Sequence, residues 1–186
     1  MTTVAAQPFT GTFLAVPEPS TFAFAVRHSG VFWYRGALSD VAATLRSHGD
    51  ALELEGVASV DSISVVQPPA MRKSVLGPEF FDAERHPELT FRSTAIHLAD
   101  GSRAEIEGEL TMRGVTRPVI AVGRYAPPRQ SSFGVIAGLT LQTSIDRREF
   151  GFAWQAELPG GGVAVGWDVV VDIDLLLKRE DPDAEG

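Results

Sequence analysis

The stretch VAVGWDVVVDIDLLL, residues 163–177, decides the fold class of this chain. Apolar side chains occupy every second position in it, and Asp168, Asp172 and Asp174 lie between them. A helix cannot separate residues in this way, whereas a strand places alternate side chains on opposite faces. At about 3.3 Å per residue the stretch would extend roughly 50 Å, well beyond an ordinary strand. This length indicates the curved wall of a barrel or a strongly coiled sheet.

The same period-two alternation recurs along most of the chain and predicts further strands. It is clear at residues 22–28, 105–112 and 135–145, and in the second of these segments glutamates alternate with apolar side chains. Acidic residues on one face and aliphatic residues on the other indicate a sheet with one solvated and one buried face. Weaker strand patterns lie at residues 10–16, 31–45, 51–59, 89–98 and 116–125.

One region is predicted to be helical, at about residues 59–76. It is interrupted by Pro68 and Pro69, and Pro69 suits the first position of a helix. The sequence therefore predicts an all-β fold, an antiparallel β-barrel of about eight strands with a short helical insertion. Closure removes the edges of the sheet, and a barrel of this size can hold one small ligand.

The composition is that of one ordinary globular domain. The 186 residues include no cysteine, which excludes disulfides, thiolate metal sites and cysteine nucleophiles. The formal charge of −8 disfavours binding to nucleic acid. We expect the domain to span residues 10–177, with disordered tails at residues 1–9 and 178–186. No window is apolar for long enough to cross a membrane, and the N-terminus shows no secretory pattern, so a cytoplasmic protein is expected.

Histidine is the side chain most often used in catalysis and metal binding, and the chain has four. None stands at helical i, i+4 spacing or in a two-histidine, one-carboxylate pattern, so no metal or cofactor is predicted. The sequence also lacks a Gly-x-Ser-x-Gly elbow. His28 lies on the apolar face of its strand, where its ring needs a hydrogen-bond partner. It is either a satisfied core histidine or a polar contact inside a pocket.

Five segments in the same order resemble the YceI-like family, whose members are lipocalin-like barrels associated with binding polyisoprenoid lipids. They extend over nearly the whole chain, from about residue 10 to residue 177. The most specific is GPEFFD at 77–82 followed by HPELTFRST at 86–94. The others are STFAFAVRH at 20–28, VDSI at 60–63, EGELTMRGVTRPV at 107–119 and IDRREFG at 145–151.

The chain departs from the family within the insertion. Relatives often carry an Arg-Asp pair and then His-Leu before the Phe-Phe-Asp element. Residues 70–76 read AMRKSVL instead, without the acid or the histidine. Contacts that those two side chains make in relatives are therefore not carried over to this chain.

The resemblance implies a non-catalytic protein that binds a long apolar lipid, a polyisoprenoid or a prenyl quinone, in the interior of the barrel. Small inward-facing residues such as Gly108 would leave room for it. Arg147 is expected to orient its turn or to pair with a carboxylate rather than to touch ligand. The family match, and the alternation that puts these residues on one face of their strands, predict a cavity wall of Phe22, Phe24, Val26, Phe91, Leu139, Leu141, Trp167 and Val169. They also predict a polar contact at His28 and a lid of Phe80 and Phe81.

Two other functions stay open at this point. One is an enzyme that acts on an apolar substrate through His28 and a nearby acid. The other is a structural or stress-related barrel whose interior is packed solid. The sequence also leaves a homodimer open.

Overall fold

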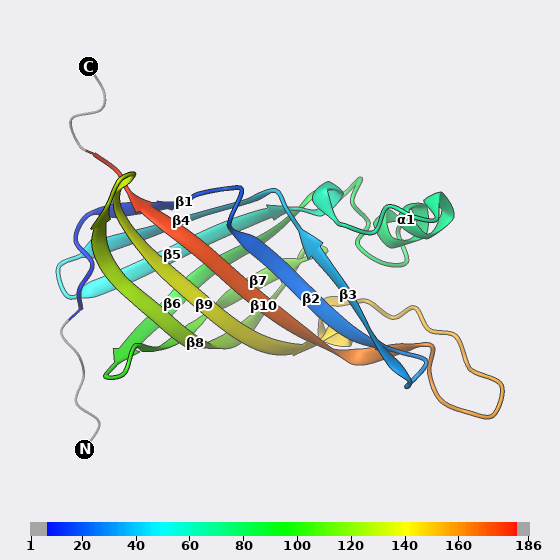
Figure 1. Ribbon diagram of the computed structural model, residues 1–186. Coiled ribbons are helices and arrows are strands. Elements are labelled where there is room, and N and C mark those ends of the chain that lie inside the picture. Colours follow the sequence, from blue (N-terminus) through cyan, green and yellow to red (C-terminus); the bar gives the residue numbers. More distant parts are fainter. Residues whose placement is uncertain (1–6, 182–186) are drawn as a thin grey trace.

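The computed structural model describes residues 7–181, which are mostly antiparallel strands (Figure 1). Three short helices interrupt the strands: η1 (Val60–Ser62), α1 (Pro69–Leu76) and η2 (Arg147–Phe150). The all-β prediction is confirmed, and the region predicted to be helical at about residues 59–76 is helical only in η1 and α1. The strands are β1 (Thr12–Ala15), β2 (Thr21–His28), β3 (Phe32–Leu38), β4 (Val41–His48), β5 (Ala51–Ser59), β6 (Glu88–Ala99), β7 (Arg103–Met112), β8 (Val115–Ser131), β9 (Gly134–Asp146) and β10 (Val165–Arg179).

Eight of these strands close into a barrel, as the sequence predicts. The order is β1-β4-β5-β6-β7-β8-β9-β10, and β1 pairs with β10 to complete the ring. The hairpin of β2 and β3 extends the sheet beyond the ring, because β2 pairs with β10 from Val165 to Asp174. Further along the same edge, residues 177–179 of β10 pair with β1. The unusual length of β10 thus lets one strand serve two successive partners.

One predicted strand, residues 31–45, is two strands in the structure. The chain turns at Ser39 and Asp40 as it leaves the hairpin and joins the barrel. The amide of Ser39 donates to Ser62 Oγ at 3.1 Å, and the carbonyl of Asp40 accepts the amide of Ser59 at 2.9 Å. This turn contains no glycine or proline, and its signal in the sequence is the weaker one of the turn-favouring pair Ser39-Asp40.

The two faces of the barrel wall differ as the alternation predicts. In β7, Ile106 and Leu110 are buried while Glu105 and Glu109 are exposed. The interior is therefore apolar, and many of the carboxylates that give the chain its negative charge lie on the outer face.

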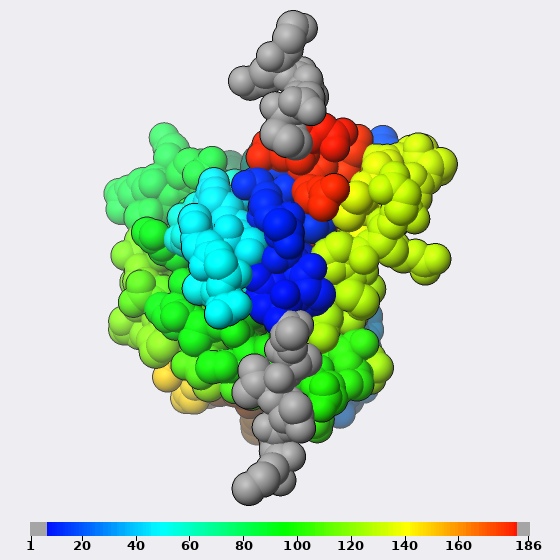
Figure 2. All heavy atoms as spheres, turned by 90° about the vertical axis from the view of Figure 1, so that its left-hand side faces the viewer, coloured from blue at the N-terminus to red at the C-terminus, as the bar shows by residue number. Residues whose placement is uncertain are grey.

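The N-terminal segment plugs one end of the barrel, at the left of Figure 1; this end faces the viewer in Figure 2. Phe9 is only 2% exposed, and its ring packs edge-on against Phe13 at 5.4 Å between centroids. Gln7 Nε2 donates to Ser47 Oγ at 2.9 Å. The predicted disordered tail at residues 1–9 is therefore wrong from Gln7 onward, because Phe9 completes the core.

The boundaries at the two ends of the domain need one more correction. Strand β10 continues to Arg179, so the predicted C-terminal tail at residues 178–186 begins too early. Glu180 still donates its amide to the carbonyl of Thr12 at 2.9 Å, and residues 1–6 and 182–186 of the predicted tails lie outside the described residues. Within residues 7–181, none of the helices has the length and apolar character that a membrane crossing requires.

Candidate ligand-binding cavity

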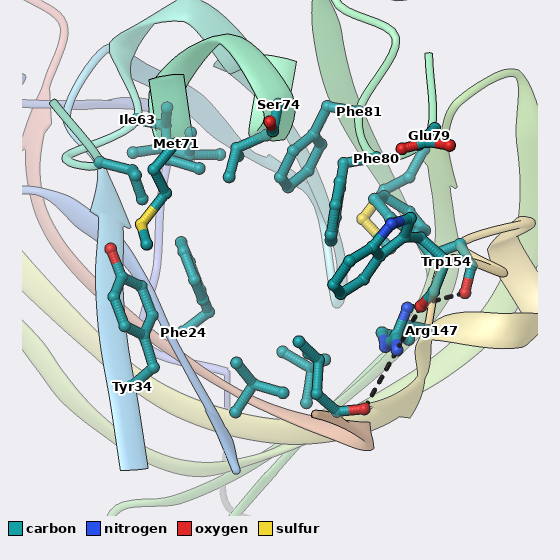
Figure 3. A pocket seen from close by; sticks show the side chains of 18 of the residues that line it. Phe24, Tyr34, Ile63, Met71, Ser74, Glu79, Phe80, Phe81, Arg147 and Trp154 are labelled. Carbon is teal, nitrogen blue, oxygen red and sulfur yellow. Dashed lines mark hydrogen bonds between the residues drawn. The ribbon is translucent and has the colours of Figure 1, made fainter. Parts of the chain in front are cut away.

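A cavity of about 460 Å³ lies in the half of the barrel next to α1 (Figure 3). Its volume is within the range of small-molecule sites. Its wall comes from β2, β3, the segment 63–81, the start of β6, the ends of β7 and β9, η2 with the loop that follows it, and the first half of β10. The larger apolar side chains in this wall are Phe22, Phe24, Tyr34, Leu38, Ile63, Met71, Phe80, Phe81, Leu89, Met112, Ile145, Phe152 and Trp154.

The cavity reaches the surface beside α1. Met71, Ser74 and Glu79 line the cavity and are also exposed. The plugged end of the barrel contributes nothing to the lining, because Phe9 and Phe13 are packed in the core cluster instead. A ligand would therefore pass through the opening on the α1 side.

The insertion is held over the cavity by two aromatic pairs. The ring centroids of Phe80 and Trp154 lie 5.2 Å apart, and the Phe81 ring meets the Phe152 ring edge-on with 5.1 Å between centroids. Arg113 joins the same two segments, since it donates to the carbonyls of Gly151 and Pro78 at 2.6 and 2.8 Å. Phe80 and Phe81 thus lie where a lid was expected, although Trp154, which completes the first pair, carries no signal in the sequence pattern.

Seven of the eleven predicted contact residues line this cavity. A smaller cavity of about 80 Å³ lies deeper in the barrel, and Phe22, Phe91 and Leu141 line it. Leu139 is buried in the core and lines neither cavity, and Trp167 lies outside both. The seven residues are Phe22, Phe24, Val26, His28, Phe80, Phe81 and Val169.

A bulge in β10 between Val165 and Val169 explains why Trp167 lies outside the cavities. Val165 is opposite His28 and Val169 is opposite Val26, so four residues of β10 advance while β2 advances by two. Such a bulge breaks the alternation of faces locally. The Trp167 ring instead lies 4.3 Å from the guanidinium of Arg147.

Arg147 is a buried cation on the cavity wall. Its side chain donates to four main-chain carbonyls, those of Gly166, Phe152, Trp154 and Val165, at 2.8–3.1 Å. Burial lowers the pKa of this guanidinium. Among residues 7–181 no carboxylate forms an ion pair with it, so the carbonyls compensate its desolvation. Arg147 orients its turn, as expected, and joins β10 to the loop after η2.

Asp146 precedes Arg147 and caps η2. Its Oδ1 accepts the main-chain amide of Arg148 at 2.9 Å, and its carboxylate pairs with the Arg148 guanidinium. These hydrogen bonds from Arg148 lower the pKa of Asp146. The pair holds the end of β9 that positions Arg147.

Asp146→Asn is expected to be less stable than the wild type near neutral pH, with the difference disappearing in acid. A carboxyl whose pKa is depressed by folding stabilises the fold above its unfolded pKa, about 3.9 for aspartate, and loses this effect as the pH falls through the folded pKa. Urea unfolding at about pH 7 and about pH 2.5 measures the change. Asp174→Asn, an exposed position of β10, is the control. A loss for Asp146→Asn that is the same at both pH values would show that the charge of Asp146 is not what stabilises the turn.

Phe91 occupies the space that Gly108 was expected to leave for a ligand. A Cβ on Gly108 would lie 2.5 Å from Cε2 of the Phe91 ring and 2.5 Å from the carbonyl oxygen of Arg92. Phe24 packs on Gly36 in the same way, since a Cβ there would lie 2.8 Å from Cε1 of its ring. The glycines thus accommodate two aromatic rings of the wall, and the free volume lies elsewhere.

His28 has a local partner and lines the cavity. Its Nδ1 lies 3.1 Å from Ser29 Oγ, and its ring is 5.1 Å from Phe32. Within the described part of the chain no carboxylate lies at ion-pair distance from His28. The acid that an enzyme based on His28 would need is therefore not beside it.

A histidine and two acids do gather elsewhere, on the outside of the barrel. His97, Glu105 and Glu107 bring their ligand atoms within 4.8 Å of one another on β6 and β7. The sequence pattern does not indicate this cluster, because the three residues are spread over two strands and only the cross-strand register brings them together. They do not line either cavity.

A closed antiparallel barrel with an apolar internal cavity and a helical insertion after β5 is a lipocalin-like fold. The model of the YceI-like domain matches residues 13–177 of this chain. The chain belongs to the YceI-like family.

Individual relatives are more distant. A UPF0312 protein of Azotobacter vinelandii is 27% identical over 135 residues, which are 69% of this chain and 68% of that protein. The crystal structure of BcnA from Burkholderia cenocepacia has a TM-score of 0.70 at 20% identity and covers 87% of this chain and 98% of its own. A polyisoprenoid binding domain from Saccharophagus degradans has a TM-score of 0.64 at 13% identity, with 92% and 100% coverage. These structures share the fold.

Proposed function

We propose that the protein binds an apolar lipid, a polyisoprenoid or a prenyl quinone, in the cavity and catalyses no reaction on it. The observation that carries the proposal is the cavity of about 460 Å³ with an almost wholly apolar wall. Transfer of an apolar chain out of water contributes about 25 cal/mol per Å² of buried area, less the cost of ordering the chain. Phe22, Phe24, Val26 and Val169 would contact the tail.

The cavity argues against a barrel that is packed solid. One water molecule occupies about 30 Å³ in the liquid, so a space of about 460 Å³ far exceeds a packing defect. The family resemblance and the polyisoprenoid binding domain of similar fold support a lipid in this space. A cytoplasmic location and a homodimer stay predictions.

Filling the cavity is expected to abolish most of the binding without unfolding the protein. In Val26→Phe/Val169→Phe, two facing residues of β2 and β10 would project larger rings into the space. We expect the affinity for geranylgeraniol, used as an apolar isoprenoid probe, to fall by about tenfold or more, because the rings and the probe compete for one volume. Native mass spectrometry and titration of the probe measure the change.

Val122→Phe is the matched control, because it adds the same ring to an exposed position on β8 that lines neither cavity. The control is expected to bind like the wild type. Equal affinity in the filled variant, or no uptake of any isoprenoid probe by the wild type, would refute the proposal.

A further inference from the structure

The end of the barrel where the cavity opens carries exposed apolar side chains. On the β2–β3 hairpin, Val31, Phe32 and Trp33 are 76%, 49% and 41% exposed. In the insertion, Val66 and Met71 are 56% and 41% exposed. Both elements lie at the right-hand end of Figure 1, opposite the plugged end. We call these five residues, which lie on two elements at the same end of the barrel, the mouth patch; large exposed apolar areas on a surface mark interaction sites.

The hairpin segment 26–36 and the part of the insertion at 62–78, which Asp61 and Glu79 flank, are basic, although the chain as a whole has a charge of −8. Segments 26–36 and 62–78 contain Arg27, Arg35, Arg72 and Lys73 and no Asp or Glu. Arg72 is neutralised by Asp61, at 2.9 Å.

Arg27, Arg35 and Lys73 are exposed, and none of them takes part in an ion pair within residues 7–181. Arg27 stacks on Trp33 at 4.9 Å, which places a cation directly beside the patch. The mouth patch is thus bordered by three cations without carboxylate partners.

Several carboxylates near this end are engaged with neighbouring arginines. Asp146 pairs with Arg148 at 2.5 Å, and Asp82 lies 3.8 Å from Arg85. Glu79 is the one acid among the described residues that line the cavity. The five apolar residues and the three unpaired cations therefore lie at one end of the barrel, where Glu79 is an exposed carboxylate without an ion pair among residues 7–181.

We propose that the mouth patch docks on an anionic lipid bilayer, with Val31, Phe32 and Trp33 inserted at the headgroup level. Apolar and aromatic side chains bordered by Lys and Arg have the composition that binds such an interface. Met71 belongs to both the patch and the cavity wall, so a docked barrel would open toward the bilayer. A lipid could then enter the cavity without crossing water. This inference rests on the proposed function, because it gives the bound lipid its source.

The test is flotation with vesicles of phosphatidylcholine alone and of equal parts phosphatidylcholine and phosphatidylglycerol. The wild type is expected to float with the anionic vesicles and to be released by high salt. Val31→Ser/Phe32→Ser should reduce partitioning by about tenfold or more, because the inserted apolar area is lost. Arg27→Gln/Arg35→Gln/Lys73→Gln should reduce it by roughly fivefold per cation, and only on anionic vesicles.

The matched control is Phe133→Ser at the opposite end of the barrel. Phe133 is 75% exposed, as much as Val31, and it follows β8 at the β8–β9 turn. It should float like the wild type. Equal loss in Phe133→Ser and in the hairpin variant, or no flotation of the wild type with anionic vesicles, would overturn the proposal.

Two further readouts separate the remaining outcomes. Uptake of geranylgeraniol without vesicles reports on the cavity alone: intact uptake without flotation refutes docking, and flotation without uptake refutes the proposed function while docking stands. Light scattering reports the oligomeric state. If the hairpin variant changes that state and floats normally, the patch is a contact between two copies and docking is refuted.

Discussion

Arg147→Met is expected to lower the free energy of unfolding by about 3–4 kcal/mol, a large fraction of the stability of an ordinary domain. The guanidinium of Arg147 donates to four main-chain carbonyls, and Arg147 itself is only 5% exposed. A methionine fills similar space but offers no donor, so the carbonyls of Gly166, Phe152 and Trp154 would lose these bonds in a largely buried site, while the carbonyl of Val165 keeps Gln155 Nε2 as a donor. Urea denaturation followed by circular dichroism measures the loss.

The neighbouring arginine provides the matched control. Arg148→Met removes the same kind of side chain from an exposed position whose partner is the carboxylate of Asp146. The loss of unfolding free energy in Arg148→Met is expected to be much smaller, because water can solvate the carboxylate of Asp146 that is left without its partner. If the two variants lost equal stability, the carbonyl contacts of Arg147 would not be the cause. Because Arg147 also lines the cavity, isoprenoid binding should weaken together with stability.

Gly108→Ala is expected to cost about 2–3 kcal/mol, although it adds a single methyl group. The new Cβ would lie 2.5 Å from Cε2 of Phe91 and 2.5 Å from the carbonyl oxygen of Arg92. The ring can move only into the smaller cavity that it lines, and the carbonyl belongs to the paired strand β6. Both adjustments disturb the barrel wall.

Gly138→Ala is the control for Gly108→Ala. It also lies in a barrel strand, β9, but its nearest neighbour would be Ala126 Cβ at an ordinary 3.5 Å. Its stability should stay within about 0.5 kcal/mol of the wild type. Thermal and urea unfolding of the pair test the prediction, and a Gly108→Ala protein as stable as Gly138→Ala would show that Phe91 does not depend on the glycine.

The sequence predicted the barrel well because alternation is a property of the backbone. Strands such as β7 bury every second side chain wherever they run, so their faces can be assigned without knowing their neighbours. The assignment failed where the backbone stops alternating. Trp167 lies in a bulge of β10 that has two residues more than the paired part of β2, and the apolar alternation of residues 163–177 continues through it, with Gly166 as the one weak signal.

The cavity itself was less accessible to sequence reasoning. Whether a glycine leaves space depends on the neighbouring strand, and Phe91 fills the space above Gly108 although the two are far apart in the chain. Trp154 and Phe9 lie in segments without strand periodicity, yet Trp154 packs on Phe80 beside the cavity and Phe9 plugs the barrel. Long-range packing decides these positions, and one sequence does not show it.

The shared edge of β10 also governs the order in which the protein can be assembled during synthesis. Strands β4 to β9 each pair with the strand that follows, so hairpins can form as the chain emerges from the ribosome. Strand β2 pairs with β3 and then with β10, and β1 pairs with β4 and β10. The apolar side chains of β1 and β2 therefore stay partly exposed until β10 has been synthesised. Until then a nascent chain of this fold needs protection from aggregation.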